Sequence, residues 1–168
     1  GFWESNFGTS TNLNEDNINI SITGGTYDDQ SLSQLLKGIT VWLEGLPQEQ
    51  RSKVTLTYAG NDTESVARVA KNFDALCHLN LLGFISIEEL QKIHRNSIAN
   101  LYIKINRTFH HKAIEILSAG RPIICYPEES NEVIDIAKTT NIPLYSCTTT
   151  QDISQALSES LNTEPKKV

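Results

Sequence analysis

The chain has 168 residues, which is enough for one domain of ordinary size and too few for two substantial ones. Hydrophobic residues make up 39% and charged residues 20% of the sequence, a balance that excludes a disordered chain. The net charge of −6 and the pI near 5.2 argue against a nucleic-acid partner, and no apolar run approaches the roughly 18 residues of a transmembrane helix.

Three cysteines, Cys77, Cys125 and Cys147, lie in apolar or strand-like stretches, and their odd number does not suit a disulfide framework. We therefore expect reduced, buried thiols and a cytoplasmic location. The chain opens with Gly1 and contains no Met, which is compatible with a piece of a longer protein.

Residues 1–16 are polar and show no period, so we predict a linker or tail there, followed by one domain over 17–162 and a frayed tail over 163–168. Within the domain, short β-rich runs alternate with longer amphipathic runs. The predicted strands are Ile18–Thr23, Val54–Tyr58, Leu79–Leu82, Leu101–Ile105, Pro122–Cys125 and Ile142–Tyr145.

Apolar residues at spacings of three and four predict six helices between and after these strands. The apolar stripes cover residues 32–46, 66–73, 90–93, 113–117, 133–137 and 153–161. Asn61 followed by Glu64 predicts the start of the second helix, and Ser86 followed by Glu89 is a capping-box pattern for the third. Gly120 is expected to end the fourth.

Six βα units in strict alternation indicate a parallel sheet, because parallel strands need crossover helices. We therefore predict an α/β fold, a doubly wound, Rossmann-like three-layer (αβα) domain with a parallel sheet of about six strands. Ligands of such sheets bind at the carboxyl ends of the strands, so the loops that follow the strands hold the candidate site.

The loop after the first predicted strand reads Thr23-Gly24-Gly25-Thr26-Tyr27 and leads into a helix near Asp28. Glycines let a ligand approach the backbone closely, and the free amides of a helix N-terminus attract anions. However, Asp28 and Asp29 oppose an anion, and the spacing matches neither G-x-G-x-x-G nor a Walker A loop. A phosphate cradle and a plain glycine turn both remain open interpretations of this loop.

The stretch from Phe109 to Pro122 places Lys112 and Glu115 three residues apart in the first turns of a helix that opens at a strand end. An ammonium and a carboxylate there could hold a diphosphate and a pair of sugar hydroxyls. An ordinary i, i+3 salt bridge explains the same spacing equally well.

Histidines give no metal site by their spacing. His110 and His111 are adjacent without a third ligand nearby, and His78 and His94 are isolated, so we predict no bound metal. No Ser-His-Asp or Cys-His arrangement can be argued from the order of residues, so no catalytic residue is assigned.

Taken together, these segments resemble the C-terminal, donor-binding half of GT-B-fold glycosyltransferases of the group 1 (family 4-like) class, over about residues 18–161. The most specific match is to the K-x-x-E-x-L-x-x-G-x-P segment of that family, which is matched by Lys112, Glu115, Leu117, Gly120 and Pro122. Supporting matches are the glycine-rich loop at 24–27, the strand-Gly element at 56–60 and the segment at 81–90.

The resemblance implies an enzyme that transfers a sugar from a nucleotide-diphospho-sugar to an acceptor, with no cofactor and no protein-bound metal. Gly24, Gly25 and Thr26 match the loop that approaches the diphosphate. Phe84 and Ile85 match the strand-end loop near the base. Building a polysaccharide or glycoconjugate is a common task of such enzymes.

By position, Glu115 looks like the family glutamate that hydrogen-bonds the ribose hydroxyls. Lys112 and Arg107 are the candidate stabilisers of the diphosphate. The acceptor site and any catalytic base of such enzymes lie mainly on an N-terminal half. We therefore expect that half as the partner domain, peripheral membrane contact only through it, and no turnover by this chain alone.

The sequence also departs from the family pattern. Arg107 stands where the family often has a first glutamate, Gly25 and Gln30 stand where it often has a basic pair, and Glu129-Ser130-Asn131 replaces a Gly-Gly pair. Two alternatives follow. One is a non-catalytic Rossmann-like nucleotide-binding or interaction module, and the other is half of a sugar-nucleotide epimerase.

Overall fold

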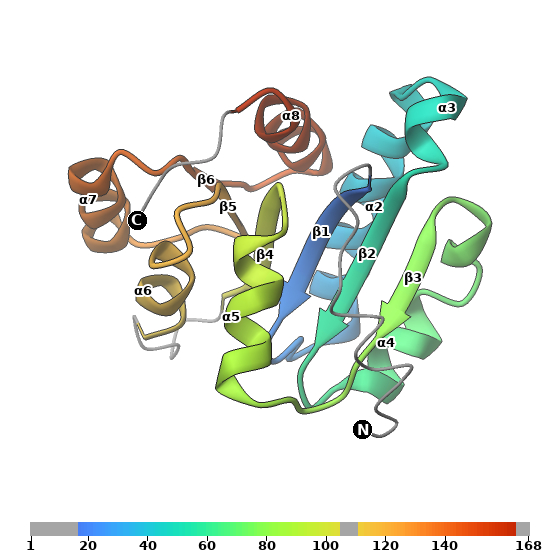
Figure 1. Cartoon of the computed structure of the whole chain (residues 1–168), viewed down its shortest axis with the longest axis horizontal. Coiled ribbons are helices and arrows are strands. Elements are labelled where there is room, and N and C mark those ends of the chain that lie inside the picture. The colour runs from blue at the N-terminus through green and yellow to red at the C-terminus, as the bar shows by residue number, and fades with distance from the viewer. Residues whose placement is uncertain (1–16, 105–110, 164–168) are drawn as a thin grey trace.

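A computed structural model describes residues 17–104 and 111–163, which form a six-stranded sheet with helices on both faces (Figure 1). The strand order is β3-β2-β1-β4-β5-β6 and every neighbouring pair is parallel. The strands are β1 (Ile18–Thr23), β2 (Val54–Ala59), β3 (His78–Leu81), β4 (Ala99–Ile103), β5 (Ile123–Tyr126) and β6 (Leu144–Ser146). The predicted Rossmann-like αβα fold is confirmed.

The helices form the two outer layers, and Figure 1 shows α5 in front of the sheet and α2 behind it. On the α2 face, α2 and α8 pack against each other and share a core with β1 and β2. The helices are α2 (Asp29–Gly45), α3 (Gln48–Arg51), α4 (Thr63–Val69), the 3-10 turn η1 (Phe73–Ala75), α5 (Ile87–Arg95), α6 (His111–Leu117), α7 (Asn131–Thr140) and α8 (Thr150–Leu161).

The strand order places a topological switch at the centre of the sheet. The chain builds β1, β2 and β3 in one direction and then crosses back to place β4 on the other side of β1. The loops after β1 and β4 therefore diverge, and this divergence opens a crevice above the carboxyl ends of the strands in folds of this kind.

Several predicted boundaries differ from those observed, for local reasons. β6 begins at Leu144 and not at Ile142. Pro143, just before it, has no amide hydrogen to donate and joins the sheet only through its carbonyl, which accepts the amide of Ile123 (2.9 Å). The second predicted helix ends at Val69, and the last residue of its predicted stripe, Phe73, begins the separate turn η1. It also begins one residue later than predicted, with Asp62 and not Asn61 at the N-cap.

The predicted capping box at Ser86 is half formed. The Ser86 hydroxyl accepts the amide of Glu89 (3.2 Å) and donates to the Glu89 carboxylate (3.2 Å). A complete, reciprocal box occurs instead at Thr149 and Asp152, which begin α8.

The central strand β1 is buried on both faces, and one of these faces is polar. Ile20 and Ile22 lie in the main core, whereas Ser21 and Thr23 alternate with them and are equally buried. The Ser21 hydroxyl donates to Asn100 Oδ1 (2.6 Å), and Thr23 Oγ1 lies 3.2 Å from His94 Nε2. His94 is thus a core histidine, not a candidate ligand.

Cys77, Cys125 and Cys147 are all free and buried, as predicted. Among residues 17–104 and 111–163, no helix combines the length and the apolar character that crossing a bilayer requires. The predicted tail at 1–16 and residues 164–168 of the predicted C-terminal tail lie outside the described residues.

Candidate functional site

A pocket of about 370 Å³ lies at the carboxyl ends of β1, β2 and β3. Hollows of about 410 and 400 Å³ also lie at the amino end of β3 and between α2 and η1, so volume alone does not single out a site. This pocket lies at the carboxyl edge of the sheet, where ligands of doubly wound sheets bind, on the β2 side of the switch point between β1 and β4. The pocket is lined by Gly24, Gly25, Ala59, Gly60, Asn61, Asp62, Phe84, Ile85 and Leu90.

Four of the predicted site residues, Gly24, Gly25, Phe84 and Ile85, line this pocket together. Thr26, the fifth from the same loops, is buried beside it. The tertiary structure therefore brings together the glycine loop after β1 and the loop after β3, which are about 60 residues apart in the sequence.

The loops after β1 and β2 are joined by direct hydrogen bonds. Gly24 adopts a positive φ of 91°, a conformation that favours glycine, and its amide donates to the carbonyl of Ala59 (3.1 Å). The Tyr58 hydroxyl donates to the Gly24 carbonyl (2.7 Å) and accepts the Asp62 amide (3.1 Å). Burial raises the pKa of Tyr58, so the phenol stays a neutral donor.

Gly60 cannot be replaced without disturbing this junction. A Cβ at Gly60 would lie 2.5 Å from the Tyr58 hydroxyl and 2.7 Å from the Gly24 carbonyl oxygen. The Gly60 amide also donates to the carbonyl of Gly83 (3.1 Å), so the loops after β1, β2 and β3 are joined to one another at the pocket.

The carboxylate of Asp62 accepts a hydrogen bond from a backbone amide of the glycine loop. The amide of Thr26 donates to Asp62 Oδ2 (2.8 Å), and the Thr26 hydroxyl lies 3.4 Å from the same oxygen. Asp62 was not among the predicted site residues. Its place directly after a strand-end glycine was a usable signal, but its contact with Thr26, 36 residues away, was not visible in the sequence.

The N-terminus of α2 is also capped by a carboxylate of the same chain. Asp28 is the N-cap, and its carboxylate accepts both the amide (2.6 Å) and the hydroxyl (3.1 Å) of Ser31. The next residue, Asp29, binds Arg68 through both carboxylate oxygens (2.9 and 2.7 Å). The negative charges of Asp28 and Asp29 therefore lie at the start of α2, where the sequence predicted that they would disfavour a bound anion. Asp29 is also paired with the cation of Arg68.

Large apolar side chains are exposed in the pocket lining and in the segments next to it in the sequence. Phe84 is 82% exposed, Ile87 70% and Tyr27 50%, although large apolar side chains are usually covered. Ile85 and Leu90 are half buried and continue this apolar surface into the pocket. The pocket thus combines apolar side chains with polar backbone groups, as small-molecule sites generally do.

The residues of the predicted K-x-x-E segment lie on α6, which follows β4 across the switch point. The side chain of Glu115 is exposed and lies outside the lining of the pocket. Lys112 belongs to the same helix. Arg107, and His110 of the histidine pair, lie outside the described residues.

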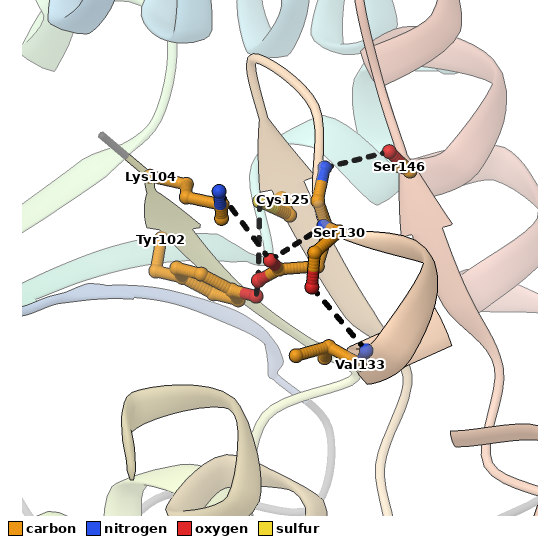
Figure 2. Close-up of polar contacts among 7 residues, drawn as sticks. Tyr102, Lys104, Cys125, Ser130, Val133 and Ser146 are labelled. Atoms are coloured by element: carbon orange, nitrogen blue, oxygen red, sulfur yellow. Dashed lines mark hydrogen bonds and ion pairs between the residues drawn. The ribbon is translucent and has the colours of Figure 1, made fainter. Parts of the chain in front are cut away.

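A second polar cluster, which the sequence did not predict as such, lies at the carboxyl ends of β4 and β5. Glu129 is buried, with only 4% of its side chain exposed, and accepts hydrogen bonds from the Tyr102 hydroxyl and the Ser130 amide (2.7 Å). Lys104 Nζ lies 3.8 Å from its Oε1. Figure 2 shows the side chains of Tyr102, Lys104 and Cys125 converging from neighbouring strands, with Ser130 on the following loop.

Burial is the main cause of the raised pKa values of Tyr102 and Cys125, and the neighbouring Glu129 carboxylate adds to both. Both groups therefore stay protonated and donate to that carboxylate, with Cys125 Sγ at 3.9 Å. The cluster fixes the loop after β5 and engages the cation of Lys104. A glutamate in place of the family's Gly-Gly pair was its only sequence signal.

Within the described part of the chain, no group of three or more His, Cys, Asp or Glu residues is arranged to hold a metal ion.

Comparison with known proteins gives structural but no sequence relatives. No protein-family profile matches the chain, and no curated protein is significantly similar in sequence. Solved structures do match it: a trehalose-phosphate synthase (UDP-forming) from Burkholderia xenovorans (TM-score 0.69, 10% identity), the lipopolysaccharide glycosyltransferase WaaG (0.67, 12%) and the UDP-GlcNAc 2-epimerase from Neisseria meningitidis (0.65, 10%).

These matches cover 96%, 95% and 95% of this chain, respectively, but only 39%, 42% and 40% of the other proteins. The chain thus spans about two fifths of their length. At such low identity the likeness shows the fold alone, and it confirms the predicted fold of one half of a GT-B protein.

Proposed function

We propose that this chain is the donor-binding half of a glycosyltransferase of the group 1 class, which transfers a sugar from a nucleotide-diphospho-sugar to an acceptor. The observation that carries the proposal is the pocket at the carboxyl ends of β1, β2 and β3. It joins the glycine loop of Gly24 and Gly25 to the apolar residues Phe84 and Ile85. The GT-B-like fold and the K-x-x-E segment on α6 support it.

In this proposal the nucleotide-sugar binds in the pocket and extends beyond its lining toward α6. The base lies against Phe84 and Ile85, where apolar surface meets backbone polar groups. The diphosphate lies toward Gly24–Thr26, and Glu115, exposed on α6, accepts the ribose hydroxyls. Lys112 and Arg107 are the candidate cations for the leaving diphosphate, whose charge such groups stabilise in the transition state.

The acceptor and any catalytic base belong, in this proposal, to an N-terminal half of the same protein. The cleft between the halves would exclude water, and the transfer would need no protein-bound metal. Assembly of a polysaccharide or glycoconjugate in the cytoplasm, with peripheral membrane contact through the N-terminal half, is the setting we propose.

Thermal unfolding with and without millimolar UDP, GDP and ADP tests the proposal. A ligand at 100 times its Kd stabilises a protein by about 2.7 kcal/mol. For a chain of this size this corresponds to a rise in Tm of about 5–10 °C. We expect such a rise with one nucleotide, its loss in Glu115→Ala, and its retention in Glu44→Ala, which changes an exposed glutamate near the far end of α2. No rise with any of the three would contradict the proposal.

One alternative enzyme has specific support. The matched UDP-GlcNAc 2-epimerase, like the glycosyltransferases, is covered over about two fifths of its length by this chain. An epimerase half predicts preference for UDP and, in the full-length protein, conversion of the sugar nucleotide without any acceptor. Product analysis of such a reaction, with the acceptor omitted, separates the two activities.

A non-catalytic module also has a specific observation in its favour. Carboxylates of Asp28 and Asp62 already occupy donors near the proposed diphosphate position, and Arg68 and Lys104 are engaged by carboxylates of the same chain. A module that serves interaction alone predicts no nucleotide-dependent rise in Tm, in the isolated chain or in the full-length protein, whereas a non-catalytic nucleotide-binding module predicts a rise without any sugar transfer by the full-length protein.

A further inference from the structure

The backbone amides of the glycine loop are not equally available to a ligand. The Gly24 amide donates to the Ala59 carbonyl (3.1 Å), and the Asp28 amide donates to the Thr26 carbonyl (2.7 Å). Both acceptors are backbone atoms, held in place by the strand end and by the turn. The Thr26 amide differs, because its acceptor is the side-chain carboxylate of Asp62 (2.8 Å). A side chain can rotate away, whereas a backbone carbonyl cannot.

Asp62 also lines the pocket, so its charge lies next to the volume that a ligand would fill. Its backbone is fixed independently of its carboxylate, since the Asp62 amide donates to the Tyr58 hydroxyl (3.1 Å). The carboxylate can therefore leave Thr26 while the loop after β2 keeps its place. The Thr26 hydroxyl, 3.4 Å from the same oxygen, would be released together with the amide.

An anionic ligand at the glycine loop would meet two costs. It would compete with the Asp62 carboxylate for the Thr26 donors, and it would be repelled by the charge of that carboxylate as long as it stays. An uncharged nucleoside, bound against the apolar side of the pocket at Phe84 and Ile85, would meet neither cost.

We propose that Asp62 is an internal competitor for the phosphate-binding donors of the glycine loop and that it sets which ligands the pocket accepts. A nucleoside diphosphate binds only when the carboxylate leaves Thr26, whereas a nucleoside binds with the carboxylate in place. This inference rests on the proposed nucleotide pocket and adds a specificity-determining residue to it.

Titration calorimetry of the 168-residue chain tests the inference. The wild type, Asp62→Asn and the control Asp135→Asn, an exposed position on α7, are each titrated with UDP, GDP and ADP. The tightest of these diphosphates is then compared with its own nucleoside. Asparagine keeps an oxygen that can accept the Thr26 amide but removes the charge.

We expect Asp62→Asn to bind the diphosphate about tenfold more tightly or better, which corresponds to at least about 1.4 kcal/mol. The Kd of the nucleoside should stay within about twofold of the wild-type value, since only a charged ligand feels the removed charge. Asp135→Asn should match the wild type for both ligands. The contrast between diphosphate and nucleoside separates this effect from a general change in the pocket, which would alter both affinities.

Two results overturn the inference while the proposed function stands. One is equal diphosphate affinity of the wild type and Asp62→Asn, and the other is an equal gain for the diphosphate and the nucleoside. If neither variant binds any of the three diphosphates, the inference and the proposed function fall together. Should Asp62→Asn not give a cooperative melt, Asp62→Ser, which also removes the charge, takes its place with the same expected contrast.

Discussion

The contact between α2 and α8 gives a sharp test of the packing, because it depends on a glycine inside a helix. Gly38 lies in the middle of α2, and a Cβ there would lie 2.6 Å from Cβ, 2.7 Å from Cγ2 and 3.0 Å from Cδ1 of Ile153 on α8. Rotation of the Ile153 side chain moves Cγ2 and Cδ1 but not Cβ. Relief of the clash therefore requires one helix backbone to shift.

We expect Gly38→Ala to destabilise the protein, although alanine is the better helix former. Overpacking a close-packed core costs typically about 1–3 kcal/mol, and the fixed Cβ contact places this site at the upper end. Alanine in a helix interior recovers about 1 kcal/mol relative to glycine. The net loss of about 2 kcal/mol corresponds to a drop in Tm of about 4–8 °C for a chain of this size.

Gly45, the last residue of the same helix, provides the matched control. Nothing lies within 4 Å of a Cβ at Gly45, so Gly45→Ala should be neutral or stabilising, by up to about 1 kcal/mol. Urea unfolding followed by far-ultraviolet circular dichroism compares both variants with the wild type. A Gly38→Ala variant as stable as the wild type would refute the close approach of α2 to α8.

Two further predictions concern buried polar and titratable groups. Glu129→Gln should lower the free energy of unfolding by about 1.5–3 kcal/mol, because a charged acceptor of buried hydrogen bonds and the counter-ion of Lys104 is lost. Urea unfolding should show no such change for the exposed neighbour in Glu128→Gln. Burial raises the pKa of Cys77 from 9.0 to about 12, so the unfolded chain releases this proton first. The stability that the protonated thiol contributes is complete below pH 9 and is lost as the pH rises to about 12. Cys77→Ala should reduce this alkaline slope by up to about 1.4 kcal/mol per pH unit, as measured by urea midpoints across that range, and an unchanged slope would contradict the burial of the thiol.

The site shows where sequence reasoning succeeds and where it stops. The glycines of the first loop were candidates because they follow a strand, whereas Phe84 and Ile85 were named only through the family resemblance. The pocket does bring these four residues together. Asp62 and Glu129 were not expected as site residues. Each acts on a residue distant in the sequence, Asp62 on Thr26 and Glu129 on Tyr102, 36 and 27 positions away.

The sequence by itself determined the class of fold and the order of its elements. Strand length, helical periodicity and strict alternation are local properties, and together they require a parallel sheet with crossover helices. The first strand and the start of the helix after it were predicted within a few residues, because β-branched runs and capping side chains act on their own neighbours.

Only the tertiary structure decided how polar groups pair across the sheet. The sequence shows Ser21 and Thr23 alternating with isoleucines, a pattern typical of a strand with one face in water. The strand instead lies at the centre of the sheet, where Asn100 and His94, 79 and 71 residues away, satisfy these hydroxyls. Such pairs depend on which strands become neighbours, and a local sequence pattern does not contain that information. The hydrogen bond from the Thr26 amide to the Asp62 carboxylate has the same origin, because it joins the loops that follow two neighbouring strands.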